Sequence, residues 1–319
     1  MSLSEEFHAK EFTPVPWIYK KAPFDLQENF FLLGSCFAQE FYQALVSLGQ
    51  RVFLNPFGNL FNPLSLGKAM SLLQDNGWDP RTEIFEHKGL WRHPDFHTSF
   101  ADPDRNKALE NHKLSLSLGK MALHKASVVI ITFGTAFYYK FKETGAIWAN
   151  CHELPGDRFE RLRASVEEMT LMWTPLLTEL KLQGKKVFLT LSPVRHLRDD
   201  PVENSLSKAI LRVFIQNLLD RDLGVYFPAY EILLDELRDY RWYAEDLAHP
   251  SSQAAEYITA RFWEATAGKH LKEMGLEFKT LQHRASHIPL HPHSKENLER
   301  LASESLRWEK FYKKYPKES

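Results

Sequence analysis

The chain has few cysteines, no excess of either charge and no long apolar run, and each shortage excludes a class of protein. Only 2 cysteines occur in 319 residues, too few for a disulfide framework. The 40 Lys and Arg against 41 Asp and Glu give a net charge of -1, so nothing favours nucleic acid as a partner. No apolar run is long enough to cross a bilayer, and residues 1–6 lack the regions of a signal peptide. We therefore expect a cytoplasmic protein with no membrane partner.

Nucleotide cofactors also lack support, because neither a G-x-G-x-x-G nor a G-x-x-x-x-G-K motif occurs. What the chain does contain is short apolar runs that alternate with longer amphipathic segments, as in βαβ units with a mainly parallel sheet. The expected strands are 29–33, 51–54, 127–133, 186–191 and 225–227, with a hairpin over 138–149. The expected helices include 36–48, 157–182 and 253–267.

These elements predict one α/β domain, a flavodoxin-like three-layer sandwich, over residues 29–267. An N-terminal extension over 1–28 precedes it. An aromatic, histidine-rich stretch at about 77–104 has no clear pattern and is expected to be an irregular insertion. Residues 268–319 are charged and are expected to form a helical C-terminal extension.

The most informative stretch is Leu33-Gly34-Ser35-Cys36-Phe37-Ala38, which follows an apolar strand and precedes a helical pattern. A residue just after such a turn lies at a helix N-terminus, where unpaired N–H groups favour an anion. A cysteine there tends toward the thiolate and becomes a usable nucleophile. The alternative is a tight turn followed by a small buried cysteine.

A second feature is the segment Asp246-Leu247-Ala248-His249-Pro250-Ser251. Pro250 disfavours the α conformation at His249, and the serine caps the following helix. Such a loop can hold Asp246 beside His249, the orienter and base of a nucleophile triad. The alternative is an ordinary surface turn.

Position in the predicted fold links these features, because parallel sheets form their sites beyond the carboxyl ends of the strands. Polar residues or glycines follow each strand in turn: Cys36, Gly58, Asn59, Gly134, Thr135, Ser192, Arg195, His196, Asp246 and His249. We expect these residues to meet at one edge of the sheet. Arg195 and His196 are candidates for binding a substrate carboxylate, phosphate or sugar hydroxyl.

Together, the turn and the late Asp-x-x-His resemble the SGNH/GDSL hydrolase superfamily. The string Gly34-Ser35-Cys36-Phe37-Ala38 is similar to the motif that names the GSCFA family, a branch grouped with that superfamily. The resemblance implies an SGNH-type hydrolase fold. It also implies a hydrolase or acyltransferase that acts on small-molecule or carbohydrate-linked acyl esters.

The resemblance also assigns roles to single residues. Gly34-Ser35-Cys36 aligns with the superfamily's Gly-Asp-Ser, so the resemblance implies Cys36 as the nucleophile, with Ser35 as the alternative. Asp246 and His249 keep the roles of orienter and base.

The implied oxyanion hole is less complete. Its glycine has Gly58 as the best candidate. The superfamily's Gly-x-Asn-Asp block falls on Gly134-Thr135-Ala136-Phe137, where the asparagine is missing. Asn59, Thr135 and Asn150 are the candidate replacements for its side-chain donor.

Two other functions, a ligand-binding protein and a thiol redox protein, stay open at this point, whereas a zinc site is not expected. The missing asparagine and the substituted nucleophile favour a ligand-binding protein that keeps the pocket without turnover. A zinc site from Cys36, Cys151, His152 and His249 has no support from ligand spacing, so we expect no metal. A thiol redox protein would need Cys151 beside Cys36, since the chain has no C-x-x-C motif.

Overall fold

A five-stranded parallel sheet in the order β10–β9–β5–β1–β2 forms the centre of the fold. The computed structural model describes residues 13–75, 83–198, 200–286 and 294–316. The strands of this sheet are β1 Asn29–Gly34, β2 Arg51–Leu54, β5 Val128–Phe133, β9 Lys186–Leu191 and β10 Val225–Phe227. Numbered along the chain, the order is the flavodoxin-like one, so the predicted fold class is confirmed.

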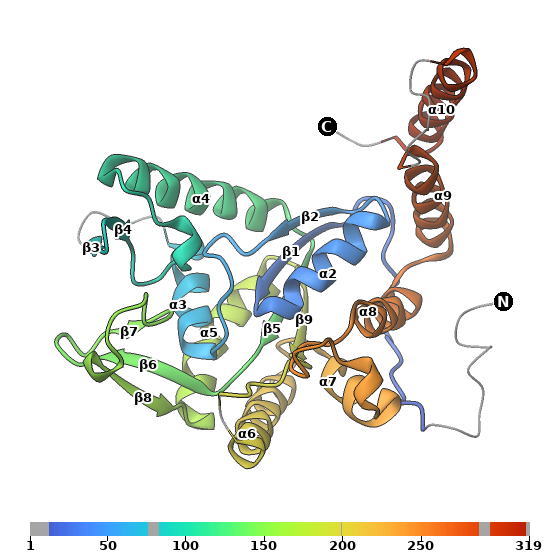
Figure 1. Ribbon diagram of the computed structural model, residues 1–319. Helices are drawn as coiled ribbons and strands as arrows, with labels where there is room; N and C mark the ends of the chain where they lie inside the picture. Colours follow the sequence, from blue (N-terminus) through green and yellow to red (C-terminus); the bar gives the residue numbers. More distant parts are fainter. Residues whose placement is uncertain (1–12, 76–82, 199, 287–293, 317–319) are drawn as a thin grey trace.

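Helices cover both faces of this sheet (Figure 1). One face carries α3 Pro63–Gln74, α4 Arg105–Lys125, α5 Val166–Leu182 and α6 Pro201–Leu219, and the other carries α2 Cys36–Ser47 and α8 Ser252–Thr266. Successive side chains of a strand point to opposite faces. Phe31 and Leu33 of β1 therefore join the first core, whereas Phe30 and Leu32 join the second. Burial on both faces explains the unbroken apolar composition of β1 and β5.

Two small antiparallel sheets lie beside the main one. β3 Phe85–His87 pairs with β4 Leu90–Arg92 inside the expected insertion, of which residues 77–82 lie outside the described part. The other sheet has the order β7–β6–β8, from β6 Phe137–Phe141, β7 Ile147–Trp148 and β8 Phe159–Arg163. The hairpin predicted over 138–149 is confirmed by the β6–β7 pairing.

The helix predicted over 157–182 is wrong in its first part, because residues 159–163 form β8 and α5 begins only at Val166. β8 pairs along its whole length with β6, and Phe159 is buried against Phe141 and Trp148. The side chain of Ser165 then caps the helix by accepting the amide of Glu168. Pairing with a distant strand thus overrides the local helical spacing.

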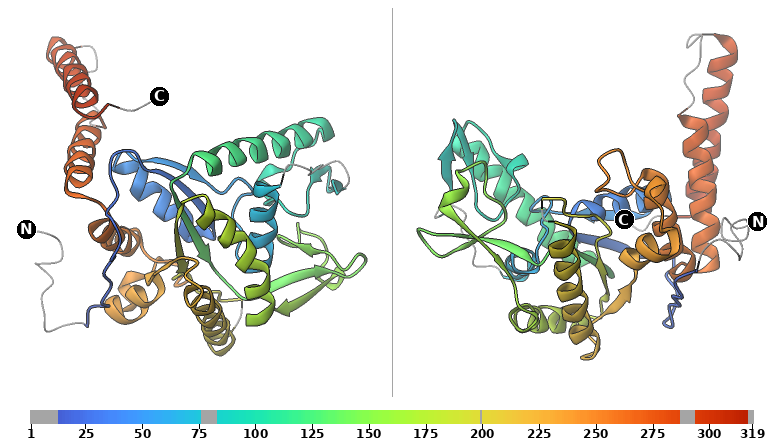
Figure 2. Two further views of the ribbon diagram at one scale, coloured as in Figure 1. Left: turned by 180° about the vertical axis from the view of Figure 1, so that it is seen from behind. Right: turned by 60° about the horizontal axis from the view of Figure 1, so that its bottom comes forward.

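The C-terminal region forms two helices, α9 Lys269–Ala285 and α10 Lys295–Lys314, as the charged pattern predicts. They run antiparallel, with the ring of Phe278 against the rings of Trp308 and Phe311. Figure 2 shows this hairpin projecting from the α/β domain. At the other end of the chain, the amide of Phe24 donates to the carbonyl of Thr266, so the described N-terminal segment packs against the domain.

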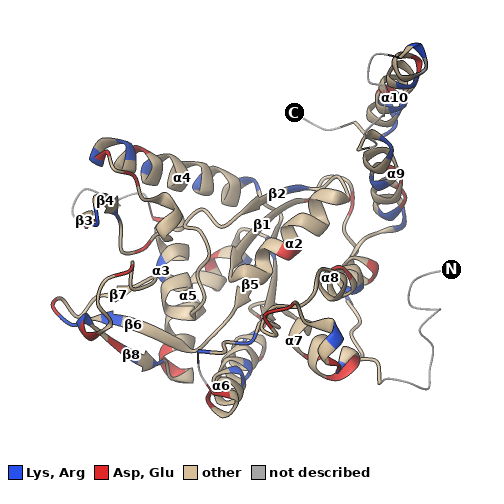
Figure 3. Ribbon diagram, in the orientation of Figure 1, with Lys and Arg blue, Asp and Glu red and all other residues tan. Residues whose placement is uncertain are grey.

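Between β10 and α8 the chain forms the short helix α7 Ala229–Glu231 and a π-helical turn over Ile232–Leu237. Charges of both signs are interspersed along the helices, whereas the central strands carry few (Figure 3). Within the described ranges, no helix has both the length and the apolar character needed to span a membrane.

Candidate active site

The turn Gly34-Ser35-Cys36, called the nucleophile turn below, is held in place by hydrogen bonds to two neighbouring segments. Gly34 ends β1, Ser35 precedes the first helical turn and Cys36 begins α2. The amide of Gly34 donates to Oδ1 of Asn55 at 2.8 Å, and the amide of Ser35 donates to the carbonyl of Thr132 at 3.2 Å. These bonds place the half-buried Cys36 at the carboxyl end of the central strands, where its position in the sequence predicted it.

The Asp246–His249 loop places an imidazole on the cysteine. Oδ1 of Asp246 accepts the amides of Ala248 and His249 at 2.9 and 3.0 Å, and its Oδ2 lies 2.6 Å from Nδ1 of His249. Nε2 of His249 then lies 3.3 Å from Sγ of Cys36. Because the ionised carboxylate can only accept, Nδ1 carries the proton and Nε2 is free to accept one from the thiol. The two features that the sequence predicted to meet do meet.

Arg195 holds this loop in place. Its backbone amide donates to the carbonyl of Ala248 at 2.9 Å, and its guanidinium donates to the carbonyl of Leu247 at 3.2 Å. Leu247 has a φ of 55°, a conformation that costs a branched side chain energy and therefore needs support. The structure therefore gives Arg195 a positioning contact with the loop through its backbone amide and one guanidinium nitrogen, and its part in substrate binding stays a prediction.

The charges of the site follow from this geometry. The two loop amides and the imidazole hold the pKa of Asp246 down at about 2, so its carboxylate is ionised at neutral pH. Burial raises the pKa of the Cys36 thiol, while its own amide, the ammonium of Lys208 and the amide of Phe37 act in the opposite direction. Forming the thiolate therefore depends on these nearby donors and charges.

The predicted glycine donor of the oxyanion hole, Gly58, is occupied elsewhere. The amide of Gly58 donates to the carbonyl of Asn55 at 2.8 Å, closing a turn in which Gly58 has a φ of 75°. The amides of Gly134 and Thr135 both donate to the carbonyl of Phe61, at 2.8 and 3.0 Å. The expectation that the amide of Gly58 is a free oxyanion donor is therefore wrong. The N–H groups of Gly134 and Thr135 likewise fasten the loops of the site to one another.

Asn59 is a predicted side-chain donor that the network leaves available. The amide of Gly34 fixes which atom of the Asn55 side chain is oxygen, so Nδ2 of Asn55 donates to Oδ1 of Asn59 at 2.8 Å. Nδ2 of Asn59 has no partner within the part of the chain that the structure describes. The next amide, of Leu60, donates to the carbonyl of Gly34 at 3.1 Å, so this segment runs beside the nucleophile turn.

Of the other two candidates, Thr135 has its hydroxyl in hydrogen bonds, whereas Asn150 is bonded among the described residues through its side-chain oxygen alone. Oγ1 of Thr135 lies 3.2 Å from Oγ of Ser207 and also accepts the amide of Phe137. Oδ1 of Asn150 accepts the amide of His152 in the loop after β7.

Two further predicted residues, Ser35 and His196, lie beside Gly134. A Cβ built on Gly134 would be 3.3 Å from both Cβ of Ser35 and Nε2 of His196. Oγ of Ser35 is buried, and no described residue is its hydrogen-bond partner. The structure therefore pairs the base with Cys36 and not with Ser35. Burial and the charge of Lys208 lower the pKa of His196 to about 4, so this ring is neutral at pH 7.

The second cysteine belongs to a different part of the molecule. Cys151 packs with the small cluster around Phe141 and Trp148, whereas Cys36 packs with the core between α2 and α8. Both cysteines are free thiols. The structure therefore does not bring together the residues that a zinc site or a Cys36–Cys151 redox pair would need.

Another group of residue types that bind metals lies in the insertion. It consists of Glu83, His93 and Asp95. Nζ of Lys68 lies 2.7 Å from Asp95 and 3.6 Å from Glu83, so one ammonium already pairs with both carboxylates. This group lies outside the Cys36 site.

Lys208 is a residue of the site that the sequence analysis missed. Its side chain is 2% exposed, and Nζ donates to the carbonyls of Gly134 and Ser192, both at 2.7 Å. The available signal was its position in α6, three residues before Leu211 and seven before Ile215, both buried. A lysine on the apolar face of an amphipathic helix predicts a buried, functional or paired ammonium.

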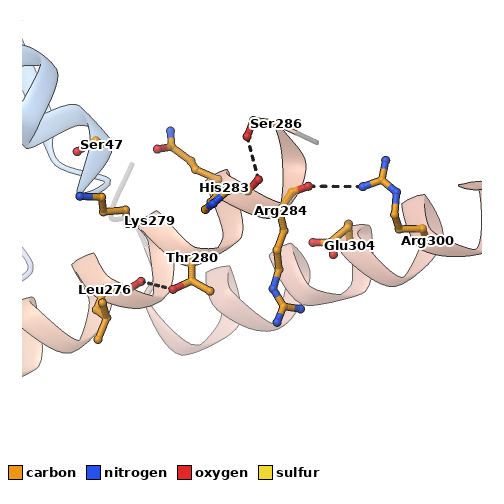
Figure 4. Close-up of a pocket in the computed structure, with 10 residues that line it drawn as sticks. Ser47, Leu276, Lys279, Thr280, His283, Arg284, Ser286, Arg300 and Glu304 are labelled. Atoms are coloured by element: carbon orange, nitrogen blue, oxygen red, sulfur yellow. Dashed lines mark hydrogen bonds between the residues drawn. The ribbon is translucent and has the colours of Figure 1, made fainter. Parts of the chain in front are cut away.

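A large hollow on the described surface lies elsewhere. It has a volume of about 1160 Å³ and runs along α9 and α10, where Arg300 reaches the carbonyl of Arg284 (Figure 4). Its lining includes Leu276 and Glu304 but neither Cys36 nor His249. Its size is therefore no guide to the place of the chemistry.

A doubly covered parallel sheet with hydrogen-bonded Cys36, His249 and Asp246 at its carboxyl edge defines an α/β protein with a candidate nucleophile site. The chain belongs to the GSCFA family, whose model matches residues 29–262. No curated protein matches the chain in sequence.

The chain is also similar to solved structures, among them the following two. A GDSL-like lipase from Bacteroides thetaiotaomicron is 11% identical, with 77% of this chain and 91% of that chain covered and a TM-score of 0.38. A catalytic mutant of an acetylxylan esterase from Geobacillus stearothermophilus is 12% identical, with coverages of 79% and 98% and a TM-score of 0.40. The family assignment therefore rests on the sequence match.

Proposed function

We propose that the protein is a hydrolase or acyltransferase for acyl esters that works through an acyl-enzyme on Cys36. The observation that carries the proposal is the relay in which Asp246 orients His249 and Nε2 of His249 lies 3.3 Å from Sγ of Cys36. A thiol, a base within reach and a carboxylate that fixes the tautomer are the parts of nucleophilic acyl transfer.

The reaction has two halves. His249 takes the thiol proton, the thiolate adds to the ester carbonyl, and the tetrahedral intermediate expels the alcohol, which receives that proton from His249. Water or an acceptor hydroxyl then attacks the thioester while His249 removes its proton. The second intermediate collapses to release the acid or the new ester, and Cys36 regains the proton. Both intermediates carry an oxyanion, for which we propose the amide of Cys36 and Nδ2 of Asn59 as donors.

The proposed substrates are small-molecule or carbohydrate-linked acyl esters, the class that the superfamily resemblance implies. His249 and Asp246 have side chains about half exposed, at 49% and 50%, so the relay is open to an incoming ester. No sequence motif supports a nucleotide cofactor in this reaction.

The test is intact-mass spectrometry after brief incubation with p-nitrophenyl acetate near neutral pH. The variants are Cys36→Ala and His249→Ala, with Ser35→Ala and Cys151→Ala as matched controls. We expect an acetyl adduct on the unsubstituted protein and on both controls, and none on Cys36→Ala or His249→Ala.

Two outcomes would overturn the proposal. An adduct that persists in Cys36→Ala but disappears in Ser35→Ala would move the nucleophile to the serine. A folded protein that forms no adduct at any pH would instead favour a ligand-binding protein that keeps the pocket without turnover.

A further inference from the structure

We propose that Lys208 is a positioning residue for the chemistry of Cys36: its buried ammonium is the counter-ion of the Cys36 thiolate. The inference rests on the proposed function, because it assigns the charge that makes the thiol a nucleophile. It concerns ionisation of Cys36, which can be measured without any substrate.

The position of Lys208 places its buried charge at the edge of the sheet that carries the site. It enters from α6, on the opposite face of the sheet from α2, and is almost completely buried. Its Nζ donates to the carbonyl of Gly134, just beyond β5, and to that of Ser192, just beyond β9. Gly134 in turn lies against Ser35, the residue before the nucleophile. The ammonium therefore lies at the same carboxyl edge of the sheet as the sulfur.

The charge balance around Lys208 points to the cysteine. Across the described ranges, no carboxylate forms an ion pair with it, and Cys36 is the acid that interacts with it electrostatically. A buried ammonium without a counter-ion is costly. Burial lowers the pKa of Lys208 to about 7, and the charge of Cys36 opposes this shift. In the other direction, the charge of Lys208 opposes the rise that burial causes in the pKa of the Cys36 thiol.

The remaining groups near Lys208 do not replace this pairing. His196 is kept neutral by burial and by Lys208 itself. The ring of Tyr230 lies 5.7 Å from Nζ, and burial raises the pKa of this tyrosine, so it is not an anion at neutral pH. The Cys36 thiolate is therefore the negative charge that can balance the ammonium.

Lys185 shows that carbonyl binding alone does not explain the placement of Lys208. Nζ of Lys185 donates to the carbonyls of Leu123, His124 and Ala126. It precedes β9 and so lies at the amino edge of the sheet, away from Cys36. The two lysines share a bonding pattern but not a place in the fold, which makes Lys185 the matched control.

The experiment uses the full chain with Cys151→Ser, so that Cys36 is the only thiol. The rate of alkylation by iodoacetamide is measured from pH 5 to 10, with Lys208→Met and Lys185→Met added singly. An opposite charge close to an acid shifts its pKa by roughly one to three units. We expect Lys208→Met to raise the Cys36 pKa by at least about one unit and to slow alkylation at pH 7 about tenfold or more. Lys185→Met should change neither.

A Cys36 pKa that stays unchanged in a folded Lys208→Met protein overturns the proposal. If Lys208→Met does not fold, a second measurement decides. In protein labelled with ¹³C at lysine Cε, the titration midpoint of Lys208 is compared with and without Cys36→Ala. We expect removal of the thiol to lower the midpoint, and an unchanged midpoint overturns the proposal. Failure to form an acetyl adduct would refute the proposed function but leave both ionisation measurements readable.

Discussion

Replacing Gly34 by alanine tests whether the nucleophile turn depends on close approach of two backbones. Gly34 pairs with Thr132 of the central strand and has a φ of 155°, which L-residues rarely adopt. A Cβ at Gly34 would lie 2.4 Å from the carbonyl oxygen of Thr132 and 2.9 Å from its nitrogen. Because these atoms are backbone of a buried strand, they cannot move aside as a side chain would.

The magnitude follows from two costs. Overpacking at a buried position costs about 1–3 kcal/mol, and a backbone conformation that is strained for alanine costs about 1–3 kcal/mol more. We therefore expect Gly34→Ala to lower the free energy of unfolding by about 2–6 kcal/mol. It should also slow acylation, because the residue that moves is two positions from Cys36.

Alanine substitutions at two other glycines separate the cost of backbone strain from the cost of steric overlap. Gly89 has a φ of 73° with nothing within 4 Å of a built Cβ, so Gly89→Ala carries the strain alone, about 1–2 kcal/mol. Gly156 has neither strain nor a close neighbour, so Gly156→Ala should change stability by less than about 0.5 kcal/mol. Urea unfolding of the three variants gives the free energies. If Gly34→Ala costs no more than Gly89→Ala, the argument from close approach is wrong.

Two further predictions concern the oxyanion and the pH dependence. Asn59→Asp keeps the side-chain oxygen that accepts from Asn55 but removes the Nδ2 donor, so we expect acylation to slow by roughly 10²–10³-fold. The control Asn150→Ala should have little effect. Stopped-flow release of p-nitrophenol measures both rates, and a larger effect of Asn150→Ala would contradict the assignment of Asn59. The pKa of Asp246 is lowered from its ordinary value of 3.8 to about 2, so its stabilising effect is complete above pH 3.8 and is lost as the pH falls through 2. The urea midpoints of the unsubstituted protein and Asp246→Asn should therefore differ at pH 6 and converge as the pH falls below 2, and a difference as large at pH 2 as at pH 6 would refute this.

Local patterns in the sequence were sufficient for the main elements. The five central strands lie where short apolar runs predicted them, and the alternation of strands and helices predicted the parallel sheet. The turn at Cys36 and the loop at His249 were each recognisable from a few adjacent residues. Their meeting followed from a general rule, that parallel strands bring their carboxyl ends to one edge.

Helical spacing failed where a distant partner decided the structure. Residues 159–163 read as the start of a helix but form β8, because they pair with β6 and bury Phe159. Burial and hydrogen bonding with a partner outweigh the small differences in local propensity. The partner strand β6 lies outside the short stretch of sequence around Phe159 from which the helix was predicted.

The sequence by itself determined which residues have chemistry to offer, namely a thiol, an imidazole and a carboxylate at turns after strands. Only the tertiary structure decided which of them act on one another. Cys36 and His249 are 213 positions apart, and their 3.3 Å contact depends on the packing of the whole sheet. The same packing uses the amides of Gly58 and Gly134 for other bonds and buries Lys208 at the site. Each donor, acceptor and charge has many possible partners along the chain, and only the folded backbone selects one.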